Sequence, residues 1–215
     1  MFLRGVINAA LGVFRRSLQL RAIAITVLFS SIALVALGGF LSYSIGNGLF
    51  TTRQNQVIAE SERAAIEVQN TFAAASVTDE VALQTLMNSV VPNLESTDST
   101  GSRKVALLRS PNQGALQLLQ SPISTDLDTN VIPSDLRVMV RKSEGKIVYQ
   151  SVGIPVDGVI HPAIITGASV SIPLAGNYEL YLVFDLNSEQ QTLDFVQTTM
   201  AVGGFVLIFA IAGVS

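Results

Sequence analysis

The sequence holds a single histidine, His161, in the segment GVIHPAI, and it holds no cysteine. Zinc and other transition-metal sites draw mainly on several histidine and cysteine side chains, so neither these ligand sets nor a disulfide framework can be assembled from this chain. A serine–histidine–carboxylate triad would need both partners of His161 to be supplied by the tertiary structure alone. We therefore interpret His161 as an exposed loop residue. A pH-sensing role is the alternative, because imidazole titrates near neutrality.

The other patterns that could support chemistry are incomplete. Asp126 and Asp128, in STDLDTN, have the spacing of the first two ligands of a calcium loop, but the glycine and the closing glutamate of that motif do not follow. The segments GKIVYQSVG and AVGGFV match neither the P-loop nor the dinucleotide-binding pattern. We therefore predict no catalytic, cofactor-binding or metal-binding residues in these 215 residues.

The elements available to position side chains begin with a long apolar run near the N-terminus. The chain is 49% hydrophobic and 13% charged, with a mean hydropathy of +0.48, which is too apolar for an ordinary soluble domain. No charged residue lies between Arg21 and Arg53, and the most apolar part, residues 22–45, would form a helix about 36 Å long. A helix of this length spans a hydrocarbon core of roughly 30 Å.

A second apolar run follows Asp194 and continues to the end of the chain. Residues 196–214 alone would form about 28 Å of helix, just enough to cross a bilayer. We predict transmembrane helices at 22–45 and 195–215, both in contact with the lipid bilayer. Because the second run has no polar closing signal, we expect the chain to be the front part of a larger protein that continues beyond Ser215.

The distribution of charge predicts the orientation. Residues 1–21 carry four arginines and no acid, a net charge of +4, whereas residues 46–194 carry nine basic and all sixteen acidic residues, a net charge of −7. The positive-inside rule makes the N-terminus cytoplasmic and the middle segment extracytoplasmic, as in a two-pass plasma-membrane protein. The basic residues of the middle segment are scattered among an excess of acids, which argues against a nucleic-acid partner.

Two processing signals are alternatives to the first transmembrane helix. A cleaved signal peptide has an apolar region of about 7–15 residues and a small-residue cleavage site, but this run is longer and no such site occurs between Leu41 and Gly46. Arg15 and Arg16, followed by SLQL, are similar to a twin-arginine export signal. The run behind them is again too long, so we interpret these arginines as a topology anchor.

The middle segment begins with helical patterns. Apolar residues recur at helical spacing from Phe50 to Ala75 without a proline, which predicts an amphipathic helix that continues from the first apolar run. A second helix is predicted to begin at Thr78, which can cap it, and to end before Pro92; its apolar side is formed by Leu83, Leu86, Met87, Val90 and Val91.

Strand patterns follow. Residues 104–109 and 115–120 are short apolar runs separated by the turn cluster SPNQG. A short helix is predicted at 133–142, with Leu136, Met139 and Val140 on one side, and then a strand in KIVYQSV. The segments AIITGASVSIPL and NYELYLVFDL flank a short turn and predict an antiparallel hairpin. Helices followed by antiparallel strands predict an α+β domain.

Several stretches resemble a known family. The segments PSDLRVMVRKSEGKIVYQSV, PAIITGASVSIP and YELYLVFDLNSEQQTLDFVQTTMAVGG, together with RRSLQLR and IGNGLF around the first apolar run, are similar to the sensor region of actinobacterial MtrB sensor histidine kinases. The similarity is strongest from Pro133 onward. It departs from the family at Asp185, where we expect proline, and at Asp194, which places a charge close to the bilayer.

The resemblance implies a membrane receptor of a two-component system. The expected fold is an α+β, PAS/Cache-like extracytoplasmic sensor domain (residues 46–194), with long N-terminal helices and an antiparallel sheet, between two transmembrane helices. The parent protein would continue with a HAMP domain, a dimerising helix pair bearing the phospho-accepting histidine, and a domain that binds ATP and magnesium. It would act as a homodimer on an MtrA-type response regulator in envelope, osmotic or cell-division control.

None of the phosphotransfer parts is recognisable in this sequence, because His161 is followed by proline rather than by the glutamate of a phosphorylation box. We therefore predict that this chain contains no cofactor site and no kinase activity of its own. Two other functions stay open: a non-enzymatic receptor such as a chemotaxis-type transducer, and an envelope scaffold. The ligand of the outer domain also stays open between a small molecule, a lipid and an envelope protein.

Overall fold

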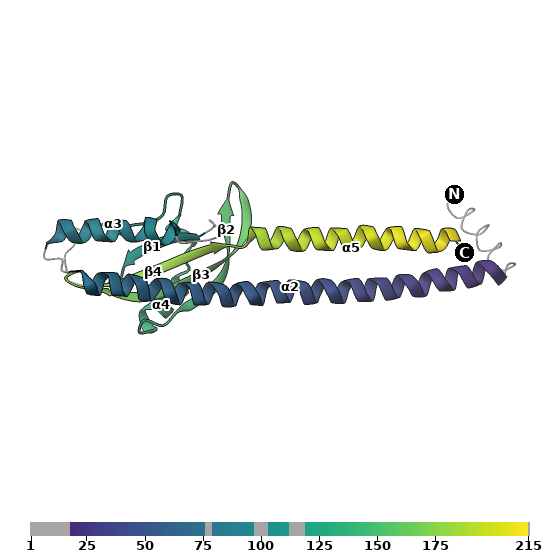
Figure 1. Cartoon of the computed structure of the whole chain (residues 1–215), viewed down its shortest axis with the longest axis horizontal. Helices are drawn as coiled ribbons and strands as arrows, with labels where there is room; N and C mark the ends of the chain where they lie inside the picture. Colours follow the sequence, from purple (N-terminus) through teal and green to yellow (C-terminus); the bar gives the residue numbers. More distant parts are fainter. Residues whose placement is uncertain (1–17, 76–78, 97–102, 112–118, 215) are drawn as a thin grey trace. The chain divides into compact units, whose positions relative to one another are not determined.

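The computed structural model describes residues 18–75, 79–96, 103–111 and 119–214 (Figure 1). The elements are α2 (Leu18–Ala74), α3 (Glu80–Ser96), β1 (Arg103–Arg109), the 3₁₀ turn η1 (Thr129–Val131), α4 (Ser134–Lys142), β2 (Val148–Val156), β3 (Val159–Ile172), β4 (Gly176–Asp185) and α5 (Asn187–Val214). The chain divides into two compact units: residues 50–190, here called the sheet unit, and residues 1–49 with 191–215, here called the apolar unit. The domain boundaries at 46 and 194 stay predictions.

The sheet is antiparallel throughout, with the strand order β1-β4-β3-β2. The predicted hairpin is confirmed as β3 and β4, and its turn has positive φ angles at Leu174 (69°) and Gly176 (90°). The hairpin of β2 and β3 closes through Asp157 and Gly158, both with positive φ, as a two-residue Asp-Gly turn requires.

The strand predicted at 104–109 is confirmed as β1, whereas the strand predicted at 115–120 is wrong in its described part. β1 pairs with β4 in the register Val105 to Leu182, and its other edge meets a short segment through a bridge from Ala106 to Ile123. Residues 119 and 120 are not in a strand, and residues 115–118 lie outside the described residues. β1 and β4 are paired at seven positions.

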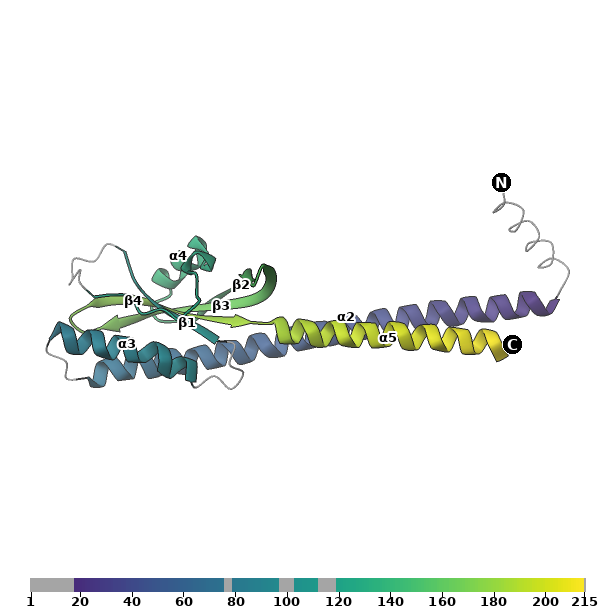
Figure 2. The same cartoon turned by 90° about the horizontal axis from the view of Figure 1, so that it is seen from above.

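Helices cover both faces of the sheet (Figure 2). The 50–74 part of α2, together with α3, packs on one face, and α4 packs on the other. Alternate residues of β4 therefore enter two buried sets, one on each face of the sheet. Tyr178, Leu180, Leu182 and Phe184 enter the core beneath α2 and α3, while Tyr181 and Val183 enter the core beneath α4. The predicted α+β class with long N-terminal helices is confirmed.

α3 differs from its prediction at its cap and at its C-terminal end. Its cap is Asp79, whose carboxylate accepts a hydrogen bond from the backbone N–H of Ala82 at 2.8 Å; Thr78 lies outside the described residues. The helix continues through Pro92 to Ser96. A proline inside a helix removes one backbone hydrogen bond. Burial of Val91 and Leu94 on either side of Pro92 offsets that loss.

α4 is confirmed as a short amphipathic helix. Pro133 occupies its N-cap, and Leu136 and Val140 are fully buried against the sheet. The prediction that Met139 shares this side is wrong, because its side chain is 41% exposed. Residues 136 and 140 are one turn apart, whereas position 139 is rotated toward solvent.

In the part that the structure describes, the apolar unit consists of two long helical segments. α2 is continuous through Gly46 and Gly48, as predicted. α5 begins at Asn187, before the apolar run at 195 from which the second span was predicted. Both helices are long and apolar enough to cross a membrane. Large apolar side chains such as Phe29, Phe40 and Phe209 are more than 60% exposed, which suits contact with lipid and not with water.

Candidate functional site

No group of three or more metal-binding side chains occurs among the described residues. Asp128 caps η1, since its carboxylate accepts a hydrogen bond from the backbone N–H of Asn130 at 2.9 Å. Asp126 is exposed and has a φ of 65°. The structure thus gives the two aspartates local roles in the loop before α4.

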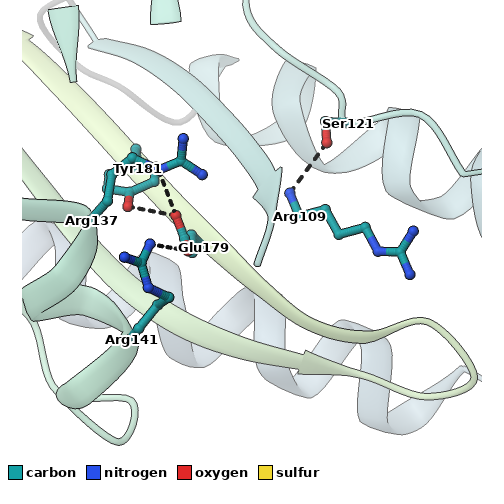
Figure 3. Close-up of polar contacts among 6 residues, drawn as sticks. All are labelled: Arg109, Ser121, Arg137, Arg141, Glu179 and Tyr181. Atoms are coloured by element: carbon teal, nitrogen blue, oxygen red, sulfur yellow. Dashed lines mark hydrogen bonds and ion pairs between the residues drawn. The ribbon is translucent and has the colours of Figure 1, made fainter. Parts of the chain in front are cut away.

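The most buried charge in the described chain belongs to Glu179 on β4 (Figure 3). Its carboxylate is 0% exposed and lies 3.0 Å from Nε of Arg137 and 3.1 Å from a terminal nitrogen of Arg141. The hydroxyl of Tyr181 donates to the same carboxylate at 2.9 Å. The two arginines stand one turn apart on α4, so both reach the sheet from the same side of the helix.

In this cluster the buried carboxylate of Glu179 is bound by two guanidinium groups and by one hydroxyl donor. Burial, and then the hydrogen bond to Glu179, raise the pKa of Tyr181 far above its usual value, so it stays a donor at physiological pH. Burial works to lower the pKa of Arg137, but the hydrogen bond and charge of Glu179 outweigh it and raise that pKa. The two guanidinium groups are about one-third exposed and remain partly hydrated. The cluster fastens α4 to the sheet.

The outer edge of β1 is closed by the segment before η1. The backbone N–H of Arg109 donates to the hydroxyl of Ser121 at 3.3 Å (Figure 3), and the N–H of Val105 donates to the hydroxyl of Ser124 at 2.6 Å. The sheet edge is therefore not free to pair with another strand along this stretch.

His161 is not the exposed loop residue that the sequence predicted. It lies in β3 opposite Ile154, its side chain is 15% exposed, and its Nδ1 is 2.8 Å from a carboxylate oxygen of Asp185. β3 extends further than its apolar core because it continues to pair with β2 as far as Val159. The second oxygen of Asp185 accepts a hydrogen bond from the backbone N–H of Asn187, the first residue of α5.

An ion pair lies at the same strand-to-helix junction. Arg53 on α2 is 6% exposed, and its Nε is 3.0 Å from the carboxylate of Glu189 in the first turn of α5. Its guanidinium carbon lies 5.9 Å from the ring centre of Phe184 on β4. This cluster, here called the junction, joins α2, the end of β4 and the start of α5, and it includes the pair formed by His161 and Asp185.

α2 is also held to β3 by polar contacts. The buried hydroxyls of Ser61 and Thr166 are 2.7 Å apart. The Gln69 side-chain amide donates to the carbonyl of Ser171 at 3.1 Å and accepts from its N–H at 3.0 Å. A displacement of β3 would therefore be transmitted to α2.

A groove of about 640 Å³ opens beside these contacts. It is lined by side chains of α2, among them Glu62, Ile66 and Gln69, and by Lys146 and Ser169 from the β2 and β3 side. One acid, one base, amide groups and an apolar residue could together bind a small polar molecule.

Comparisons with known proteins give relatives but no family model that matches. The chain is 32% identical over 217 residues to the sensor histidine kinase MtrB of Mycolicibacterium paratuberculosis, covering 98% of this chain and 37% of that protein. It is 31% identical over 205 residues to MtrB of Mycobacterium tuberculosis, covering 94% of this chain and 35% of that protein. This chain is related to the MtrB sensor histidine kinases. It spans little more than a third of the length of these relatives, and with its two apolar helices it is part of a membrane protein.

Among solved structures, the chain is similar to the ligand-binding domain of the Campylobacter jejuni chemoreceptor Tlp3, solved in complex with L-valine. The TM-score is 0.48 at 10% identity, with coverage of 77% of this chain and 66% of that one. The periplasmic sensory domain of the chemoreceptor Tlp1 from the same organism gives a TM-score of 0.45 at 12% identity, with coverage of 67% of this chain and 59% of that one. At these TM-scores the likeness carries no conclusion about ligand or mechanism.

The Glu179 cluster and the junction were not found from the sequence. One signal was present: Glu179 is the single charge inside the otherwise uncharged stretch YELYLVF, and Arg137 and Arg141 are spaced one turn apart on an amphipathic helix. An isolated acid in a strand buried on both faces requires a cationic partner.

Proposed function

We propose that this chain is the sensor and membrane input region of a two-component histidine kinase. The observation that supports this most strongly is the alignment with MtrB kinases over 94–98% of the chain. The described residues include a folded sheet unit and two apolar helices, which is the set of parts that an input region needs. The phosphotransfer reaction, with its ATP and magnesium, would belong to another part of the parent protein.

The proposed orientation places the N-terminus in the cytoplasm and the sheet unit outside. It rests on the charge difference between residues 1–21 and 46–194. α2 and α5 are each continuous from the sheet unit into the apolar unit, so the two helices connect a receptor domain directly with the membrane. A stimulus would then act by favouring one arrangement of these helices, to the extent of its differential affinity for the two arrangements.

The junction supports a route for this coupling. Asp185 ends β4 and caps α5, while the pair formed by Arg53 and Glu189 links α5 to α2. A shift of β4 relative to α2 would therefore change the first turn of α5. The response regulator would be of the MtrA type, and the receptor would be a homodimer. The groove lined by Glu62 and Lys146 favours a small polar ligand as the stimulus.

A chimeric kinase tests the proposal. Residues 1–215 replace the matching segment of a full-length MtrB kinase, and phosphotransfer to its response regulator is measured in proteoliposomes before and after an osmotic upshift. We expect the chimera to respond, and we expect the double variant R53M/E189Q to keep basal autophosphorylation but lose most of the response. An output from the chimera that ignores the upshift, while the parental kinase responds, would contradict the proposal.

A further inference from the structure

The edge of β3 has an open position inside the groove beside α2. Pairing of β2 with β3 begins at Val148, opposite Gly167, and further along β3 the backbone of Ser171 is bonded by the side chain of Gln69. Backbone groups of alternate residues in a strand point to the same edge. The N–H and C=O of Ser169, midway between these two contacts, therefore point out of the sheet at this edge. Neither group has a hydrogen-bond partner among the described residues.

The segment that passes this position does not pair with it. The backbone N–H of Lys146 donates to the carbonyl of Ser143 at 3.0 Å. A Cβ added at Gly145 would lie 3.8 Å from the carbonyl oxygen of Ser169, which places this segment beside the open position. The side chain of Ser169 lies on the other face of the sheet, because Ser169 pairs with Glu179, whose carboxylate is bound by α4. Ser169 therefore offers the groove its backbone alone.

Charged and apolar side chains surround the open position. Glu62 on α2 and Lys146 before β2 are both exposed, and neither is ion-paired with another described residue. The apolar surface comes from Ala65, Ile66 and Ile147, and Ile66 is 61% exposed. All of these residues belong to the sheet unit. The groove thus combines an anion, a cation, a main-chain donor and acceptor, and an apolar wall.

Gln69 shows which ligand group fits the open position. Its side-chain amide donates to the carbonyl of Ser171 at 3.1 Å and accepts from the N–H of Ser171 at 3.0 Å, as a residue of an added strand would. A ligand residue with both an N–H and a C=O would satisfy Ser169 in the same way. Because Gln69 bounds the position on one side and the segment at Lys146 on the other, a long strand has no room there. The volume of about 640 Å³ is that of a small-molecule pocket.

We propose that this groove binds a short zwitterionic peptide through its carboxyl-terminal residue. The amide N–H of that residue donates to the Ser169 carbonyl, and its carboxylate accepts from the Ser169 N–H and pairs with Lys146. Glu62 binds the ammonium group at the other end, and an apolar side chain of the peptide packs on Ile66. The inference rests on the proposed function in taking the groove as the site of the stimulus, and it gives the chemical class of that stimulus.

A peptide in this position would add to contacts that already join α2 to β3. Ser61 bonds Thr166, and Gln69 bonds Ser171, on either side of Ile66 along α2. The ligand bridges the same two elements between these contacts. Binding would therefore favour the arrangement in which α2 lies tightly against β3.

The dipeptide alanyl-leucine is the probe, and isothermal titration calorimetry on the full chain in nanodiscs measures its affinity. We expect saturable binding at millimolar concentrations or below, weakened at least about tenfold in K146M and in E62Q, because each variant removes a charged partner. The matched control K142M removes an exposed lysine outside the groove and should bind normally. S169P removes the backbone donor and should lose binding, whereas S169A changes only a side chain on the other face and should keep it.

Absence of saturable alanyl-leucine binding would overturn the proposal, as would equal weakening in K146M and K142M. Free leucine and the amide of alanyl-leucine should both bind less tightly than the dipeptide; leucine binding as tightly would contradict a peptide ligand. If S169P does not fold, K146M and E62Q decide the outcome. A chimeric kinase that responds to the osmotic upshift without binding the dipeptide would reject the ligand class and keep the receptor function. Dipeptide binding with the expected losses, in a chimera that ignores the upshift, would support the site and contradict the receptor function.

Discussion

The geometry of the Glu179 cluster predicts that removing its acid and removing its bases will lower the free energy of unfolding by different amounts. Glu179 is fully buried, whereas Arg137 and Arg141 are about one-third exposed. The variant E179Q removes the buried charge and leaves two guanidinium groups that water can reach. The variant R137M/R141M does the opposite, because it leaves a buried carboxylate with the hydroxyl of Tyr181 as its remaining partner in the cluster.

The difference in unfolding free energy between R137M/R141M and E179Q is large enough to measure. Leaving a buried charge without its partner costs about 3–5 kcal/mol of unfolding free energy. E179Q loses hydrogen bonds to a charged group, worth about 1.5–3 kcal/mol each, but it also removes the desolvation cost of the carboxylate, so we expect a net loss of about 1–2 kcal/mol. Replacing all three residues, as in R137M/R141M/E179L, is expected to recover at least about 2 kcal/mol relative to the double variant.

Urea unfolding of the full chain in detergent micelles, followed by circular dichroism, measures these values. If E179Q proves as destabilising as R137M/R141M, or if the triple variant recovers nothing, the interpretation of Glu179 as a buried charge neutralised by α4 is wrong.

Two further predictions concern the same region of the sheet unit. Burial and then the hydrogen bond to Glu179 raise the pKa of Tyr181 above its ordinary value of 10.0, so the unfolded chain releases this proton first and the stability of the fold should decrease as the pH rises above 10. Urea midpoints measured between pH 8 and pH 11 should therefore decrease less steeply in Y181F than in the parent chain. An unchanged slope in Y181F would contradict the assignment. G167A should destabilise by about 1–3 kcal/mol in thermal unfolding, because the added Cβ would lie 2.4 Å from Val140 and 2.9 Å from Tyr181. The matched control G204A, whose Cβ meets nothing within 4 Å, should be neutral, and equal losses in the two variants would refute the packing.

The sequence predicted the features that depend on local pattern. The uncharged runs predicted two apolar helices, the period of the apolar residues predicted the helix after Phe50, and the alternation around Ala175 predicted the β3–β4 hairpin. These features need only the chain's own periodicity and turn chemistry. The α+β class followed from their order.

The features that the sequence did not reveal depend on contacts between distant segments. The partner of β1 is β4, about 75 residues later, and no local signal distinguishes it from the nearer run at 115–120. The prediction that His161 lies in a loop was wrong because pairing with β2 extends β3 beyond its apolar core. The burial of Glu179 could not be predicted because the sequence of β4 does not tell whether α4 covers its second face.

The central claim is that the sheet unit lies outside a membrane crossed by the two apolar helices, and cysteine labelling tests it most directly. The chain has no native cysteine, so V81C, at a site 78% exposed on α3, and S17C, before the first apolar run, each carry one reactive thiol. A membrane-impermeant maleimide should label V81C on intact cells and S17C only after permeabilisation. Labelling of S17C on intact cells, with V81C protected until the membrane is opened, would contradict the account.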